Sequence, residues 1–300
     1  MSNRLFGSAY INAGDESLLQ REEDVSAALE NRVILLSDLT EVLDTELHVV
    51  TTFDYSTRRL YEFTPFPFPD AEDQWEAFRH PDLEWEWKDA DSTGRAFRGV
   101  TDIDRLTFRW NTSDTALTLG RQAIGLSTCF YLTTNDFFQP FAPEAIYREY
   151  KTGVDAINFQ YYLGPLSEID LITVAGYDSS GDFDWDESAA ILRSVFSAGN
   201  YEWTIIGGKL PWRWVAAGAL QGEISGFGVR AEFNVNFPEE GWEDAFGALE
   251  DDTYFQVAGG VDYRCENSLH IFVEYLYRDQ GYDDYMDYLY SLMRADSIRE

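Results

Sequence analysis

The chain has 300 residues with 54 acidic and 22 basic side chains, a formal net charge of −32, and 16% aromatic residues. Such an excess of acid leaves no basic surface to neutralise phosphates, which argues against a nucleic-acid partner. No run approaches the roughly 18 consecutive apolar residues of a membrane-spanning helix, so helical insertion is excluded. The rich supply of Tyr, Phe and Trp favours strands and surfaces where apolar and wet regions meet.

Alternation of apolar and polar residues with a period of two runs along the whole chain and is typical of strands with one buried face. No segment has the period of a long amphipathic helix, so the predicted fold is all-β. An additional hairpin around 83–88 would add two strands and would leave the alternation of short and long connections unchanged. We predict about 13 strands, over residues 3–12, 26–36, 42–55, 103–111, 115–123, 153–162, 168–178, 190–198, 201–208, 213–221, 224–237, 253–264 and 267–278.

The last predicted strands show the two faces most clearly. In 229–237 the residues Val229, Phe233 and Phe237 share one face, while Arg230, Glu232, Asn234 and Asn236 share the other. In 268–278 the first face carries Leu269, Ile271, Val273, Tyr275 and Tyr277. A fully apolar face must be covered by a protein core or by lipid, and the repeated charges opposite it suit a water-filled lumen.

The connections between the predicted strands alternate in length. Short ones at 37–41, 112–114, 163–167, 199–200, 222–223 and 265–266 are interleaved with longer ones at 13–25, 56–102, 124–152, 179–189 and 238–252, and with a moderate one at 209–212. Short turns on one side and long loops on the other are typical of a transmembrane barrel, whereas the crossings of a sandwich give no such rule. We therefore predict an antiparallel up-and-down transmembrane β-barrel in the bacterial outer membrane, with lipid against the outer face.

An odd number of strands does not close a bacterial single-chain barrel, and the polar end of the chain offers no closing strand. The expectation is one barrel domain over 1–300 that is a fragment, with C-terminal strands missing.

Three stretches resemble the central part of bacterial outer-membrane porin-like β-barrels: "ALTLGRQAI" at 116–124, "TTNDFFQPFAP" at 133–143 and "REYKTGVDAINFQYYLGPLS" at 148–167. In that family a strand ending in Gly-Arg-Gln leads into a loop with a Pro-Phe-x-Pro pair, and the next strand opens with Gly-Val-Asp. This chain departs from the family pattern at 125–127, where Trp-Gly is usual, and at 133–134, where Asn-Pro is usual. The resemblance implies a larger barrel and a loop folded toward the lumen.

The 124–152 loop is the candidate pore constriction. Aromatic and proline residues would stiffen it, and its charges would form an electrostatic filter; packing over the barrel rim is the alternative. The candidate constriction residues are Asp136, Phe137, Phe138, Pro140, Phe141, Arg148 and Glu149.

Strand parity also predicts a set of charges that face the lumen. They would either set up a field across the pore or pair with one another within the wall. Arg121 departs from the pattern, because its parity places it with Leu117 and Leu119, so it lies at the rim or follows a bulge. The predicted lumen-facing charges include Arg105, Arg109, Arg230, Glu232, Asp262, Arg264, Glu274 and Arg278.

Nothing in the sequence predicts covalent chemistry, a catalytic residue, a metal site or a cofactor. Cys129 and Cys265 are far apart and are interpreted as separate thiols. The leading hypothesis is a channel for passive diffusion of ions or small polar solutes, with membrane lipid as its surroundings and homo-oligomers as a further option. A plugged or partner-filled barrel acting as a scaffold or adhesin is the main alternative, followed by an outer-membrane hydrolase.

Overall fold

A computed structural model describes residues 2–12, 24–56, 78–90, 96–140, 150–178, 180–239 and 253–279. They form one antiparallel sheet of 14 strands, in which 13 strands follow one another in chain order and β4 pairs only with β5. The strands are β1 (Ser2–Asn12), β2 (Asp24–Thr40), β3 (Leu43–Ser56), β4 (Glu84–Ala90), β5 (Ala96–Asn111), β6 (Thr115–Gln122), β7 (Val154–Gly164), β8 (Ser167–Tyr177), β9 (Phe183–Ala198), β10 (Tyr201–Leu210), β11 (Arg213–Ile224), β12 (Phe227–Pro238), β13 (Tyr254–Arg264) and β14 (His270–Arg278).

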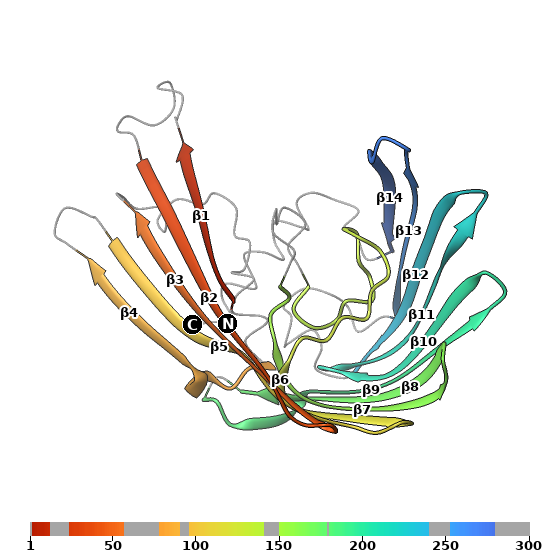
Figure 1. The fold of residues 1–300 in the computed structure, drawn as a ribbon, viewed down its shortest axis with the longest axis horizontal. Coiled ribbons are helices and arrows are strands. Elements are labelled where there is room, and N and C mark those ends of the chain that lie inside the picture. Colours follow the sequence, from red (N-terminus) through yellow and green to blue (C-terminus); the bar gives the residue numbers. More distant parts are fainter. Residues whose placement is uncertain are drawn as a thin grey trace.

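The predicted all-β fold and its antiparallel order are confirmed. The sheet curves into an open trough (Figure 1), and among the described strands β1 and β14 form no hydrogen-bonded pair with each other. In the described part of the chain, no helix has the length and apolar character that crossing a membrane requires.

Two predicted boundaries are wrong in an informative way. β9 begins at Phe183 rather than at 190, so the long connection expected at 179–189 shrinks to 178–182. Three of its first six residues, "FDWDES", are acidic and three are exposed, and their hydropathy does not reveal a strand that pairs with β8 through Tyr177. The connection at 211–212 is also a tight turn, so the alternation of short and long connections does not hold throughout.

The tight turns at one end of the sheet follow from local backbone chemistry. Ser225 and Gly226, between β11 and β12, both have positive φ, 53° and 86°. Two consecutive residues with positive φ are typical of the type I′ hairpin turn, whose twist matches that of the flanking strands. The segment "GFGVRA" at 226–231 therefore begins in this hairpin turn and continues into β12.

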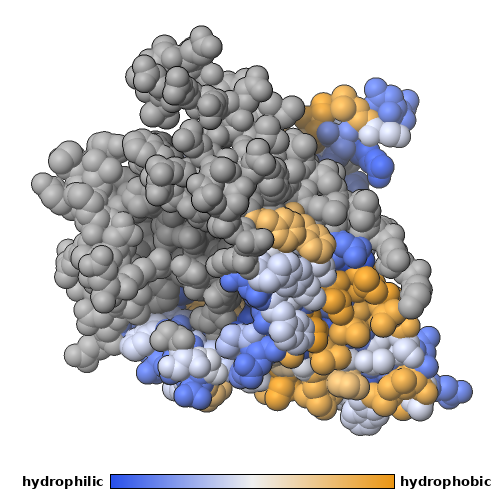
Figure 2. Space-filling model, turned by 90° about the vertical axis from the view of Figure 1, so that its left-hand side faces the viewer, coloured by the Kyte–Doolittle hydropathy of each residue, from blue (hydrophilic) through white to orange (hydrophobic). Residues whose placement is uncertain are grey.

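The convex face of the sheet is apolar and exposed. Across β5 to β14 its large side chains alternate with the polar residues of the concave face, as predicted for 229–237 and 268–278. Figure 2 shows hydrophobic side chains adjoining one another on one side of the molecule. Members of this face include Phe108, Ile157, Leu171, Leu192, Ile205, Phe233, Val257, Val261, Ile271 and Val273, all of them exposed.

Gly120 explains why Arg121 breaks the alternation. Within β6 its φ is +106°, and a Cβ atom there would lie 2.2 Å from the backbone oxygen of Leu106. Only glycine adopts this conformation without strain, and it turns the side chain that follows it while Arg121 stays paired with Leu106 and Asp155 in the ladder. Arg121 is consequently 2% exposed instead of pointing outward with Leu119.

Gly120→Ala is expected to destabilise the folded protein by about 1–3 kcal/mol, the typical cost of holding a non-glycine residue in such a backbone conformation. Denaturant unfolding of the refolded protein in detergent measures the effect. Gly125→Ala is the matched control, because Gly125 has open space around it and no positive φ. Equal unfolding midpoints for the two variants would contradict this account.

Candidate functional site

The connection between β6 and β7 folds into the trough instead of extending away from the sheet. Its described residues 123–140 leave β6 and lie against the concave face (Figure 1), where they contact β12 and β14, strands more than 90 residues further along the chain. We call residues 123–140 the inward loop. It includes Asp136, Phe137, Phe138 and Pro140, whereas Phe141, Arg148 and Glu149 lie outside the described residues.

Glu232 on β12 anchors the inward loop. Its Oε1 accepts hydrogen bonds from Ser127 Oγ at 2.5 Å, from the Cys129 amide at 2.5 Å, and from the amide and hydroxyl of Thr128. Its Oε2 accepts from the Thr134 and Asn135 amides, both at 3.1 Å, and from the Thr134 hydroxyl at 3.3 Å. Such a saturated set of donors is what a buried carboxylate requires, because an unpaired buried charge is costly.

A second carboxylate and a ladder of amides extend this anchor. Glu274 on β14 accepts from the Phe130, Tyr131 and Leu132 amides at 2.6, 2.8 and 3.0 Å. Asn234, two residues after Glu232 on the same face, donates to the Thr134 backbone oxygen at 2.6 Å. Side chains of the sheet, which forms the wall of the trough, therefore hold the inward loop through the backbone groups of the loop.

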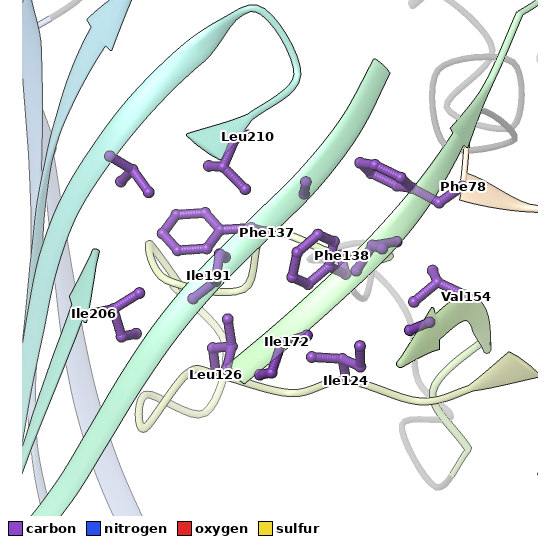
Figure 3. Packing of buried hydrophobic residues seen from close by; sticks show 14 of the residues in the cluster. Phe78, Ile124, Leu126, Phe137, Phe138, Val154, Ile172, Ile191, Ile206 and Leu210 are labelled. Atoms are coloured by element: carbon purple, nitrogen blue, oxygen red, sulfur yellow. The ribbon is translucent and has the colours of Figure 1, made fainter. Parts of the chain in front are cut away.

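A hydrophobic cluster lies between the inward loop and the wall (Figure 3). Phe137 and Phe138 pack with wall residues of β8 to β11, and Phe138 is fully buried. The concave face is thus not polar throughout, since its middle strands present aliphatic side chains to the loop. The cluster comprises Phe78, Ile124, Leu126, Phe137, Phe138, Val154, Ala156, Ile172, Val174, Ala189, Ile191, Ile206, Leu210, Val215 and Ala217.

A buried ion pair joins the inward loop to the segment that returns to the wall. Lys151 Nζ donates to Asp136 Oδ1, and the side chains are 11% and 9% exposed. Burial raises the pKa of Asp136 and lowers the pKa of Lys151, while their mutual attraction acts in the opposite direction on both. Arg105 on β5 donates to the Lys151 backbone oxygen at 2.9 Å. Asp136 is therefore a structural partner in this geometry, turned away from open water.

The remaining predicted lumen charges lie on the concave face, and several pair within the wall. Arg230 contacts Asp262 at 2.5 Å and lies over the Phe130 ring at 3.8 Å from its centroid, and His270 Nε2 also contacts Asp262 at 2.9 Å. Arg109 donates to Gln160 at 3.1 Å and to the Tyr162 hydroxyl at 3.2 Å. Arg264 and Arg278 lie at the two ends of the β13–β14 pair.

The sequence analysis did not predict the loop residues that donate hydrogen bonds to Glu232. Ser127, Thr128, Thr134 and Asn135 act largely through backbone amides, which have no signature in the sequence. The aliphatic part of the concave face did leave a signal, because 171–175, "LITVA", runs almost without alternation. A run of this kind indicates a strand covered on both faces.

Neither cysteine is in a disulfide: Cys129 is buried in the inward loop, and Cys265 is half-buried at the β13–β14 turn. Burial raises the pKa of Cys129 to about 12, and the neighbouring Glu232 carboxylate adds to the shift. Within the described ranges no three His, Cys, Asp or Glu side chains converge as ligands for a metal ion.

The fold defines an all-β protein built as one antiparallel meander, apolar on its convex face and covered on its concave face by a loop. No protein-family model and no curated protein matches the sequence. The solved structures similar to this chain include OprB from Pseudomonas putida at low pH, with 10% sequence identity and a TM-score of 0.34 over 84% of this chain and 82% of that one.

Proposed function

We propose that the protein is a bacterial outer-membrane channel for passive diffusion of ions or small polar solutes, and that the inward loop narrows its lumen. The observation that carries the proposal is the exposed apolar convex face. Val273, Tyr275 and Ile205 are 70%, 69% and 59% exposed, and comparable residues recur on neighbouring strands. Soluble monomers rarely expose a contiguous apolar surface of this kind, and lipid is the surrounding that favours it.

Aromatic residues near the strand ends support the same environment. Close to the tight turns the convex face carries Trp110, Tyr161, Trp203, Phe227 and Tyr263, and close to the opposite ends it carries Trp185, Trp214, Phe237, Phe255 and Tyr277. Amphipathic aromatic rings concentrate at the two membrane interfaces, with aliphatic residues between them.

The connections support an orientation as well. Turns at 41–42, 112–114, 165–166, 199–200, 225–226 and 265–269 all lie at one end of the meander. At the other end lie the strand ends that the long 123–153 and 239–253 connections join, together with the shorter connections at 178–182 and 211–212. In outer-membrane barrels the short turns face the periplasm. The inward loop would accordingly enter the lumen from the outer side.

The experiment that tests the proposal is a single-channel recording of the refolded protein in a planar bilayer under a salt gradient. We expect discrete current steps with a reversal potential directed toward cations, because acidic side chains outnumber basic ones by 54 to 22. A folded, bilayer-inserted protein without current would contradict the channel and favour an occluded barrel that serves as a scaffold. A monomer that stays soluble without detergent would contradict every membrane version.

A further inference from the structure

We infer that the short segment 78–83 is a second positioning element for the inward loop, with Phe78 as the residue that holds Phe138 in place. This inference rests on the proposed function for its consequence in conduction, but its structural part stands on contacts alone. The segment ends 40 residues before the inward loop begins, and it contains a 3-10 turn, Pro81–Leu83.

The segment occupies a gap in the wall. β5 pairs with β4 through residues 96–102 and with β6 through residues 106–111, while β3 follows its other edge. β4 and β6 therefore follow one another along a single edge of β5, and no ladder joins them there. The chain between β6 and β7 leaves the wall at this gap to form the inward loop.

Side chains around the gap bind the backbone of the segment. Asp155, at the start of β7, accepts from the His80 amide at 2.7 Å, and Arg121 donates to the His80 backbone oxygen at 3.0 Å. Arg121 also forms a two-pronged pair with Asp155 at 2.8 and 3.0 Å. Paired guanidinium and carboxylate groups of this geometry are among the stronger polar contacts in proteins.

Further contacts fix the segment on both sides. Arg79 pairs with Asp102 on β5, and its Nη1 lies 4.0 Å from Asp104. On the other side the His80 ring meets the Tyr177 ring of β8 edge to face, with centroids 5.1 Å apart. The segment thus links β5 to β8 beside the gap between β4 and β6.

Phe78 connects the anchored segment to the hydrophobic cluster. It is 3% exposed, and its ring meets the fully buried Phe138 edge to face with centroids 5.4 Å apart. In Figure 3 Phe138 lies between Phe137 on one side and Phe78 on the other. Removing the Phe78 ring would leave Phe138 with a cavity on that side, because neighbouring groups relax into such a space only in part.

The native thiol of Cys129 reports whether the inward loop is seated. In the seated loop Cys129 is 7% exposed and the pKa of its thiol is raised to about 12, so almost no reactive thiolate is present at neutral pH. Unseating would restore both access and ionisation. A Cys265→Ser background leaves Cys129 as the single thiol, since the chain has two cysteines.

The test compares Phe78→Ala, Phe78→Leu and Phe108→Ala in this background by the rate of labelling with a membrane-impermeant thiol reagent. Phe108 is the matched control, because it is 50% exposed on the convex face. We expect Phe78→Ala to raise the labelling rate roughly a hundredfold, the change in the unseated population that a Phe→Ala cavity implies. Phe78→Leu should restore most of the protection, and Phe108→Ala should leave the rate unchanged.

Conductance provides the second measurement, in which Phe78→Ala should raise the single-channel conductance and Phe78→Leu should bring it back.

Labelling of Phe78→Ala at the unaltered rate would overturn the positioning role. If Phe78→Ala does not fold, Phe78→Val, which also removes the ring, takes its place: a labelling rate above that of Phe108→Ala supports the role, and an equal rate overturns it. Labelling needs no current, so an absence of current in every variant would contradict the proposed channel and leave the labelling result to stand by itself.

Discussion

Glu232→Gln is expected to unseat the inward loop and to raise the single-channel conductance. The carboxylate accepts seven hydrogen bonds from five loop residues through its two oxygens. A glutamine keeps one acceptor oxygen and turns an NH2 group toward donors at the other position. Leaving buried donors unsatisfied and removing the charge that they share costs about 3 kcal/mol, enough to populate an unseated loop.

Two measurements check this result: conductance in bilayers and labelling of Cys129 in the Cys265→Ser background. Glu202→Gln is the control, because Glu202 lies on the concave face, accepts from Gln221 Nε2 at 2.5 Å, and forms no hydrogen bond with the inward loop among the described contacts. If Glu232→Gln and Glu202→Gln behave alike in both measurements, Glu232 does not hold the loop.

Ile205→Arg is expected to prevent stable insertion into the bilayer. Ile205 lies in the middle of β10 on the convex face and is 59% exposed. On a soluble protein an arginine at such a position would cost little, whereas on the lipid-facing side of a barrel near the bilayer midplane it costs about 2–4 kcal/mol. The variant therefore distinguishes lipid from water as the surroundings of this face.

The measurement is the yield of folded protein in lipid vesicles, with Gln221→Arg as the control. Gln221 lies on the adjacent strand β11 on the concave face and bonds to Glu202, so an added arginine there would find an acidic partner. We expect wild-type yield for Gln221→Arg and a strong loss for Ile205→Arg. Equal yields would contradict a lipid-facing convex surface.

Some features of this fold are encoded locally in the sequence. The faces of β12 to β14 were predictable, because a period of two places Phe233 and Glu232 on opposite sides in any register that buries one face. The first half of β9 was not predictable, because only Phe183 and Asp184 are paired to β8 there, before a β-bulge, and its acidic residues show no apolar alternation. Arg121 was recognised as irregular, but its partners Asp155 and His80 come from distant parts of the chain.

The sequence by itself determined the all-β class, the order of the strands and the apolar character of one face, since these depend on local alternation and on turns. The tertiary structure alone decided that the 123–140 connection lies inside the trough, that Glu232 and Glu274 bind its backbone, and that Phe78 meets Phe138. The physical reason is that backbone amides, a gap in a ladder and a shared apolar cluster have no local pattern. They exist only once strands that are distant in the sequence have come together.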